Sequence, residues 1–376
     1  MTNWKTYKIG DLCKISSSKR IFAKEYKDSG IPFYRGKEII EKQKGNKIST
    51  ELYISQERYD EIKAKHGVPQ KGDMLLTSVG TLGIPYIVQD EVFYFKDGNL
   101  TWFYNFEGID SRYLYYWFLS PIGKMNIDSK AIGSTQKALT IETLSKFEIS
   151  LPSLEEQRRI AGILGAIDDK IENNRRINTN LELQAQALYK QWFVDNHNDD
   201  WETLMLEDVA TLSAGGDKPQ IYSEQKTLEC NIPIYSNGID NEGLYGYTNN
   251  PRITEDSITI SARGTIGFVC LRTEPYVPIV RLISVVPTYE NMSAYFLYLW
   301  ALTQNISGTG TTQQQLTVPA FRTTKIVVPS QEALIKFNQV VKPIFDNIKQ
   351  NKKENETLAT LRDTLLPKLM NGEIKV

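Results

Sequence analysis

The chain has few of the residues from which metal sites and disulfide frameworks are built. Of its 376 residues, three are cysteines and two are histidines. Cys13, Cys230 and Cys270 are far apart and odd in number, which indicates neither a disulfide framework nor a zinc site. No apolar run could span a bilayer, and the N-terminal residues lack the apolar segment of a signal peptide. We therefore expect a cytoplasmic protein.

Motifs for catalysis are missing as well. There is no Gly-rich run ending in Gly-Lys-Ser or Gly-Lys-Thr for nucleotide hydrolysis, and no Asn-Pro-Pro-Tyr-like string for methylating a base amine. His66 lies in a charged stretch and His197 in a polar linker, where surface positions are the usual outcome. We expect no catalytic residues, no metal and no cofactor in this chain, which indicates a binding or organising protein.

Charge is nearly balanced overall but unevenly distributed. The formal net charge is -1, which argues against strong DNA binding by the isolated chain. Residues 1–152 have 22 basic and 18 acidic side chains, whereas residues 193–329 have 8 and 15. If the protein binds DNA, the first region supplies more of the attraction to phosphate, and partner proteins supply much of the rest.

The chain repeats itself once. IPFY at 31–34 recurs as IPIY at 232–235, GTLG at 80–83 as GTIG at 264–267, and GSTQKALT at 133–140 as GTTQQQLT at 310–317. From that last string onward the match continues without a gap at an offset of 177 residues. Units this large are too long for a solenoid, so the chain resembles a dimer built from one polypeptide.

Each copy mixes strand and helix patterns. Short β-rich runs at 74–79, 84–89 and 92–95 precede an aromatic helical segment at 111–120, and 257–262, 266–271 and 294–302 repeat the series. We predict an α+β fold with two globular domains, at 1–152 and 196–329. They are separated by two long antiparallel coiled-coil helices, at 153–195 and 330–376, in a pseudo-two-fold arrangement.

The two long helices have the same heptad register. Apolar residues recur at alternating spacings of four and three from Ile160 to Trp192 and from Phe337 to Leu369. Asparagines interrupt both registers at matching positions: Asn174, Asn178, Asn351 and Asn355. A polar residue in such a seam costs stability but fixes register; the alternative is a solvated site near a helix irregularity. At roughly 55 Å each, the helices are too long for one small domain and should pair with each other.

The repeated turns and polar strings are candidate DNA contacts. Gln can pair with adenine, and Ser and Thr can contact phosphate. The alternatives are a tight hairpin for the turns and a helix-capping loop for the strings. The candidates here are Ser78, Thr81, Gln136, Lys137, Arg263, Thr265, Gln313 and Gln314.

Basic residues and one asparagine outside these motifs complete the candidate set. Phosphate binding and a solvated surface both fit such residues. They are Lys19, Arg20, Lys24, Arg35 and Lys37 in the first copy, and Lys218, Asn237 and Arg252 in the second.

These features together resemble one known family. Each copy closes with a Gly-Ser/Thr-Thr-Gln string and enters a long helix through Pro-Ser, and the first helix opens as LPSLEEQRRIAGILGAIDDKI at 151–171. This resembles the specificity subunit of type I restriction–modification systems over essentially the whole chain. The second helix departs from the pattern, because VPSQEALIKFNQVV at 328–341 lacks the Glu-Gln-Arg run.

The resemblance implies a function without catalysis. Each copy would be a target recognition domain that reads one half of a bipartite, asymmetric double-stranded DNA target. The helices would set the spacer and dock two methylation subunits, which use S-adenosylmethionine, and through them ATP-dependent restriction subunits. A coiled-coil scaffold that never touches DNA, and a methyltransferase fragment with an unrecognised site, are the alternatives.

Overall fold

The protein consists of two compact units. The computed structural model describes residues 4–45, 48, 51–133, 137–308 and 315–376. Unit 1 contains Met1–Arg176 and Lys352–Val376, and unit 2 contains Ile177–Asn351. Each unit therefore holds one globular copy and a segment of each long helix. Because this division cuts both helices, the domain boundaries expected at residues 152, 195 and 329 remain predictions.

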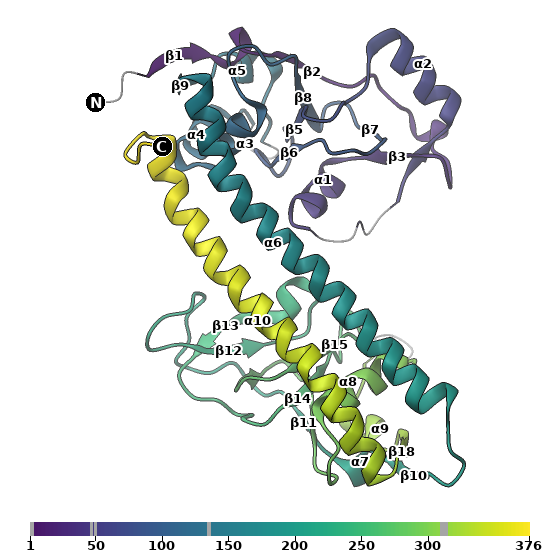
Figure 1. Ribbon diagram of the computed structural model, residues 1–376. Helices are drawn as coiled ribbons and strands as arrows, with labels where there is room; N and C mark the ends of the chain where they lie inside the picture. Colours follow the sequence, from purple (N-terminus) through teal and green to yellow (C-terminus); the bar gives the residue numbers. More distant parts are fainter. Residues whose placement is uncertain (1–3, 46–47, 49–50, 134–136, 309–314) are drawn as a thin grey trace. The chain divides into compact units, whose positions relative to one another are not determined.

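The first copy is built from three small sheets (Figure 1). Its strands are β1 (Lys5–Lys8), β2 (Lys14–Ser16), β3 (Ile31–Tyr34), β4 (Tyr53–Ile54), β5 (Met74–Thr77), β6 (Pro85–Ile87), β7 (Tyr94–Phe95), β8 (Leu100–Tyr104) and β9 (Glu148–Leu151). Its helices are η1 (Ile9–Asp11), η2 (Ala23–Glu25), α1 (Gly36–Gln43), α2 (Gln56–His66), α3 (Ser111–Leu119), α4 (Pro121–Lys130) and α5 (Ile141–Ser145). The strand orders are β2-β8-β5-β6, β4-β3-β7 and β1-β9.

The second copy repeats this topology. Its strands are β10 (Glu202–Met205), β11 (Ala210–Ala214), β12 (Ile232–Tyr235), β13 (Leu244–Thr248), β14 (Ser257–Ile260), β15 (Val269–Arg272), β16 (Val277–Pro278), β17 (Ile283–Pro287) and β18 (Lys325–Val328). Its helices are α7 (Leu206–Val209), η4 (Asp240–Gly243), α8 (Ala294–Thr303) and α9 (Val318–Phe321). The orders β11-β17-β14-β15, β13-β12-β16 and β10-β18 match those of the first copy. The α+β class and the internal repeat are confirmed.

An aromatic helix forms the centre of each copy. Asp110 caps α3 by accepting from the backbone N–H groups of Arg112 and Tyr113, and Ser293 caps α8 by accepting from the N–H of Phe296. The rings of α3 are buried against the four-stranded sheet of the first copy, and α8 is buried from Ala294 to Ala301. Fully burying one such side chain contributes about 1.5–3 kcal/mol, so these helices hold each copy together.

The two long helices are α6 (Leu154–Tyr189), followed by the π-helical turn η3 (Lys190–Asp195), and α10 (Gln331–Met370). The hydroxyl of Ser153 accepts from the N–H of Glu156 at 3.2 Å, so the expected N-terminal cap of α6 is present. In unit 1, Ile160 and Leu164 share a buried cluster with Leu366 and Leu369. No helix in the described part of the chain has the length and apolarity needed to cross a membrane.

The seam in unit 2 differs from the heptad prediction. Ala185, Tyr189 and Phe193 are buried, whereas the predicted Leu188 and Trp192 are only partly buried. The observed spacing is four residues twice in succession, because an α-helix has 3.6 residues per turn and drifts from a 3.5-residue repeat. The π-helical turn that follows Tyr189 adds to this drift.

The seam asparagines contact one another across the helix pair. In unit 1, the amide of Asn174 donates to the side-chain oxygen of Asn355 at 2.9 Å and to Glu354 at 2.7 Å. In unit 2, the amide of Asn351 donates to the side-chain oxygen of Asn178 at 2.8 Å. Within unit 1, Asp168 and Asn174 of α6 meet Arg362 and Asn355 of α10 in reverse order, so these helix segments are antiparallel. The register role of these residues stays a prediction.

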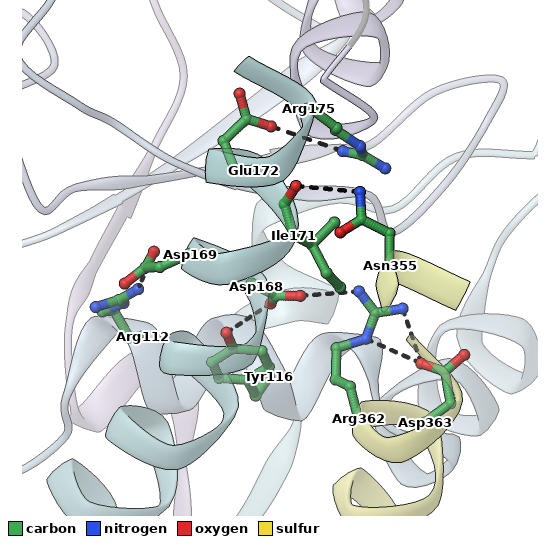
Figure 2. Close-up of polar contacts among 10 residues, drawn as sticks. All are labelled: Arg112, Tyr116, Asp168, Asp169, Ile171, Glu172, Arg175, Asn355, Arg362 and Asp363. Atoms are coloured by element: carbon green, nitrogen blue, oxygen red, sulfur yellow. Dashed lines mark hydrogen bonds and ion pairs between the residues drawn. The ribbon is translucent and has the colours of Figure 1, made fainter. Parts of the chain in front are cut away.

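A polar network ties the first copy to both long helices in unit 1 (Figure 2). Asp168 of α6 accepts from the hydroxyl of Tyr116 at 2.7 Å and from the guanidinium of Arg362 of α10 at 2.8 Å. Burial and the nearby Asp168 carboxylate raise the pKa of Tyr116 above its usual range, so its hydroxyl stays protonated and donates. A single carboxylate thus joins α3, α6 and α10.

The asparagine contacts make a stability prediction. Replacing Asn174 by leucine should lower the free energy of unfolding by about 1–3 kcal/mol, because the side-chain oxygen of Asn355 and the carboxylate of Glu354 each lose a donor at the helix seam. Replacing Asn174 and Asn355 together by leucine should recover much of that loss, since an apolar pair needs no partner. Urea denaturation of the single and double variants measures the coupling.

Asn173→Leu is the matched control, because Asn173 is exposed on the same turn of α6. It should leave the unfolding midpoint nearly unchanged. If the double variant costs as much as the two single variants added together, the asparagines do not act as a pair.

Candidate nucleic-acid interface

In both copies, the Gly-Thr-x-Gly motif forms a tight hairpin turn in the four-stranded sheet. It joins β5 to β6 in the first copy and β14 to β15 in the second. Gly80 and Gly83 have φ of 80° and 75°, and Gly264 and Gly267 have φ of 69° and 83°. These left-handed conformations favour glycine. The motif therefore serves as a hairpin turn in each copy. The exposed Thr81 and Thr265 lie in these turns.

The second glycine of each turn is also needed for packing. A Cβ on Gly83 would lie 2.3 Å from Cδ1 of Ile127, and one on Gly267 would lie 2.7 Å from the carbonyl oxygen of Ile306. Among the residues that the structure describes, none lies within 4 Å of a Cβ built on Gly80 or Gly264. The two glycines of each turn therefore differ in their described surroundings.

The structure brings the polar strings against these turns. In the first copy, the N–H of Gly80 donates to the carbonyl of Lys137 at 3.2 Å, and the N–H of Leu139 donates to that of Ser78 at 2.9 Å. In the second copy, the N–H of Leu316 donates to the carbonyl of Ala262 at 3.0 Å. The guanidinium of Arg263 donates to the side-chain oxygen of Gln315 at 3.0 Å. Sequence motifs about fifty residues apart therefore form one surface in each copy.

Several of the predicted contact residues lie on this surface. Lys137, Arg263 and Thr265 are exposed beside the turns, whereas Ser78 is only 3% exposed. Gln136, Gln313 and Gln314 lie outside the described residues. The burial of Ser78 indicates a structural role, and DNA contact by the other residues stays a prediction.

The basic residues of the first copy differ in their partners. Arg20 pairs with Asp97 at 2.8 Å but remains 69% exposed. Lys24 and Lys37 are exposed, and Lys37 lies 3.9 Å from Glu41. The backbone N–H of Lys19 donates to the hydroxyl of Tyr94 at 2.6 Å, leaving its ammonium exposed.

Arg35 has a clear structural role. It precedes α1, and its guanidinium contacts Glu38 at 2.5 Å and 3.2 Å. The Glu38 carboxylate is 1% exposed and also accepts from the backbone N–H of Arg35 at 2.8 Å. Hydrogen bonding to Glu38 raises the pKa of Arg35. A buried carboxylate left without this partner would be destabilising, so Arg35 first serves the fold.

In the second copy, the three other candidates have different environments. The ammonium of Lys218 lies 3.6 Å from the ring centre of Tyr222 and 5.8 Å from that of Tyr245. The amide of Asn237 donates to the carbonyl of Val280 at 2.6 Å and accepts from the N–H of Ala262 at 2.7 Å. Arg252 is exposed. Asn237 therefore braces two loops, while Lys218 and Arg252 are available to a ligand.

Three residues escaped the sequence analysis. Tyr222 and Tyr245 are 39% and 46% exposed next to Lys218, where aromatic rings can contact nucleic acid. Arg272 is 3% exposed, lies 3.5 Å from the ring centre of Tyr235 and donates to the carbonyl of Glu242 at 2.6 Å. It holds the loop at Asp240–Gly243. Only the alternation LYGYT at 244–248 gave a hint of the exposed tyrosines.

Comparisons with known proteins agree with this repeated architecture. A family model, described as the type I restriction modification DNA specificity domain, matches residues 1–183 and again residues 198–361. The MjaIX specificity subunit of Methanocaldococcus jannaschii is 29% identical over 413 residues, covering 100% of this chain and 94% of that protein. The HindI specificity subunit of Haemophilus influenzae is 27% identical over 342 residues, covering 67% of this chain and 74% of that protein.

A solved structure supports the fold. The S subunit of a type I restriction–modification system from M. genitalium matches with a TM-score of 0.60 at 19% identity, covering 98% of this chain and 96% of that one. The double match of the family model, over more than half of the residues, establishes the relationship. The chain belongs to the type I restriction–modification DNA specificity family.

Proposed function

We propose that this chain is the DNA-recognition subunit of a type I restriction–modification assembly, and that each copy reads one half of a bipartite target. The observation that carries this proposal is the repeated hairpin surface with different exposed residues. Val79 in the first copy corresponds to Arg263 in the second, on the same backbone turn. A reader of an asymmetric sequence needs this combination of one scaffold and two different surfaces.

Contacts to DNA divide into two kinds. Lys and Arg side chains at the rim neutralise phosphates and position the protein. Side chains at the turns reach base edges, where an arginine can bind guanine through two hydrogen bonds. Thr81 and Lys137 in the first copy, and Arg252, Arg263 and Thr265 in the second, are exposed and suited to these tasks.

Catalysis belongs to partners in this proposal. Methylation subunits bring S-adenosylmethionine, restriction subunits bring ATP, and this chain docks them. Both long helices support docking, because each has exposed apolar side chains: Ile163, Ile177, Leu183, Ile335, Val340 and Leu361. The net charge of -1 also favours an assembly in which partners add to the attraction for DNA.

Exchanging one copy tests the proposal. Replacing residues 1–152 by the corresponding domain of a relative with a different target should change one half of the methylated sequence and leave the other half intact. Expression with the methylation subunits, followed by sequencing of methylated bases, gives the result. The matched control replaces residues 196–329 and should change the opposite half. Alteration of both halves by either exchange would refute independent reading.

Lengthening the helix pair tests whether it sets the spacing between half-sites. Four residues are inserted between Arg176 and Ile177 in α6 and four between Asn351 and Lys352 in α10, so both asparagine contacts stay within their units. The added length is about 6 Å, close to two base pairs at about 3.4 Å each. The half-site sequences should persist while the unread gap grows by one or two base pairs.

Two-residue insertions at the same places serve as the control. They rotate the apolar faces by about 200° and should impair assembly. An unchanged gap in an active four-residue variant would mean that the helices only dock partners.

A further inference from the structure

The fold does not account for the residues found in a strained turn of the second copy. The turn Ile279–Leu282 is closed by a hydrogen bond from the N–H of Leu282 to the carbonyl of Ile279, at 3.0 Å. Its central residues, Val280 and Arg281, have φ of 52° and 62°. Two successive positive φ angles define a type I′ turn, which favours Asn-Gly. A β-branched residue in this region is a genuine outlier.

The corresponding connection in the first copy, between β7 and β8, has no such strained turn. The N–H of Lys96 donates to the carbonyl of Tyr34, as the N–H of Ile279 does to that of Tyr235. In the strand that follows, Thr101 of β8 pairs with Leu76, and Ile283 of β17 pairs with Ile260 at the corresponding position. The first copy has one more residue between Lys96 and Thr101 than the second has between Ile279 and Ile283. Its left-handed position is Gly98, with φ of 73°. The shorter connection explains a tight turn, but not the choice of valine and arginine in it.

The surrounding structure holds the strained turn rigidly. The N–H groups of Val280 and Arg281 donate to the carbonyls of Gly216 and Gly215, both at 2.9 Å. Asn237 donates to the carbonyl of Val280 at 2.6 Å. A Cβ on Gly215 would lie 2.7 Å from the nitrogen of Ile279, so glycine permits this close approach. Strained backbone that surrounding contacts hold in place is found most often at functional sites.

Three arginines lie in or next to this framework. Asn237 also accepts from the N–H of Ala262, directly before Arg263. A Cβ on Gly216 would lie 2.7 Å from a guanidinium nitrogen of Arg252. Arg252, Arg263 and Arg281 are all exposed, although residues 193–329 have 8 basic and 15 acidic side chains. The overall charge of this acidic domain does not explain why these arginines lie near one framework.

The side chain of Arg281 is also uncommitted. Its guanidinium forms no ion pair within the residues that the structure describes. By contrast, Asp97 in the corresponding connection of the first copy pairs with Arg20 at 2.8 Å. The second copy therefore displays a cation where the first displays an ion pair.

We propose that Arg281 is a specificity-determining residue of the second copy and that its guanidinium reads a guanine in the half-site which this copy recognises. The inference rests on the proposed function and names one residue of that site. A planar guanidinium matches the two acceptors of guanine in the major groove. Rigid backbone support limits the positions that the side chain can reach, which sharpens discrimination between bases. The first copy, which reads another sequence, has glycine at its left-handed position.

The test uses Arg281→Ala and Arg281→Lys in the full assembly with its methylation subunits and cofactor. Sequencing of methylated DNA should show one base pair of the second half-site relaxed, with discrimination reduced about 10- to 100-fold, and the first half-site unchanged. Lysine should rescue little, because it keeps the charge but lacks the two-pronged geometry. An unchanged target, or equal weakening on all sequences, would overturn the inference.

A second variant separates reading from folding. Val280→Asn with Arg281→Gly installs the residues that the turn favours, so the thermal midpoint of the isolated chain should rise by about 2–4 °C. The same variant should lose the base discrimination; retained discrimination would overturn the inference. Arg322→Ala removes an arginine that pairs with Glu207 at 3.7 Å in the same copy, and it should leave the target unchanged. If the unmodified assembly methylates no defined sequence, the proposed function itself fails.

Discussion

Each unit depends on the pairing of two long helices, which asparagines connect across the seam. Asn174 meets Asn355 in unit 1, and Asn178 meets Asn351 in unit 2. A sliding of one helix along the other would break these contacts and leave the buried amide of Asn174 without a partner, at a cost of about 1–3 kcal/mol. An apolar seam alone tolerates such slips far better. Because each globular copy packs on the same helix segments, register determines where its sheets can attach.

The network around Asp168 shows how that attachment works in unit 1. Tyr116 comes from the aromatic helix of the first copy, and Arg362 comes from the last turns of α10. In unit 2, Tyr298 of α8 donates to Glu182 of α6 and stacks edge-on against Phe345 of α10. Both copies therefore use a tyrosine of the aromatic helix to bind a carboxylate of α6; Tyr298 also contacts α10 directly, whereas Tyr116 is linked to α10 through Asp168. The hairpin turns differ between the copies, as Val79 and Arg263 show, whereas the contacts of the aromatic helix with the long helices occur in both copies.

The regular parts of this architecture could be predicted from the sequence, and the irregular parts could not. Heptad spacing located both helices and their asparagines, and the strings GTLG and GTIG located the hairpins. Arg35 looked like a phosphate ligand, although Glu38 three residues later is a readable sign of a helix-capping pair. The two bonds of Asn237 depend on loops that approach from distant parts of the chain. Arg281 was missed because valine and arginine carry no turn signal, and only φ angles expose the strain.

The interleaving of the units has a consequence for how the protein is made. Unit 2 is one continuous stretch, whereas unit 1 needs Lys352–Val376 to complete its helix pair. The ribosome must therefore add the intervening 175 residues of Ile177–Asn351 before Leu366 and Leu369 can cover Ile160 and Leu164. At about 5–20 residues per second, the apolar face of the first helix stays uncovered for roughly 10–35 s. The half of the molecule that is synthesised first is thus the last to close, and the nascent chain offers a hydrophobic surface to chaperones meanwhile.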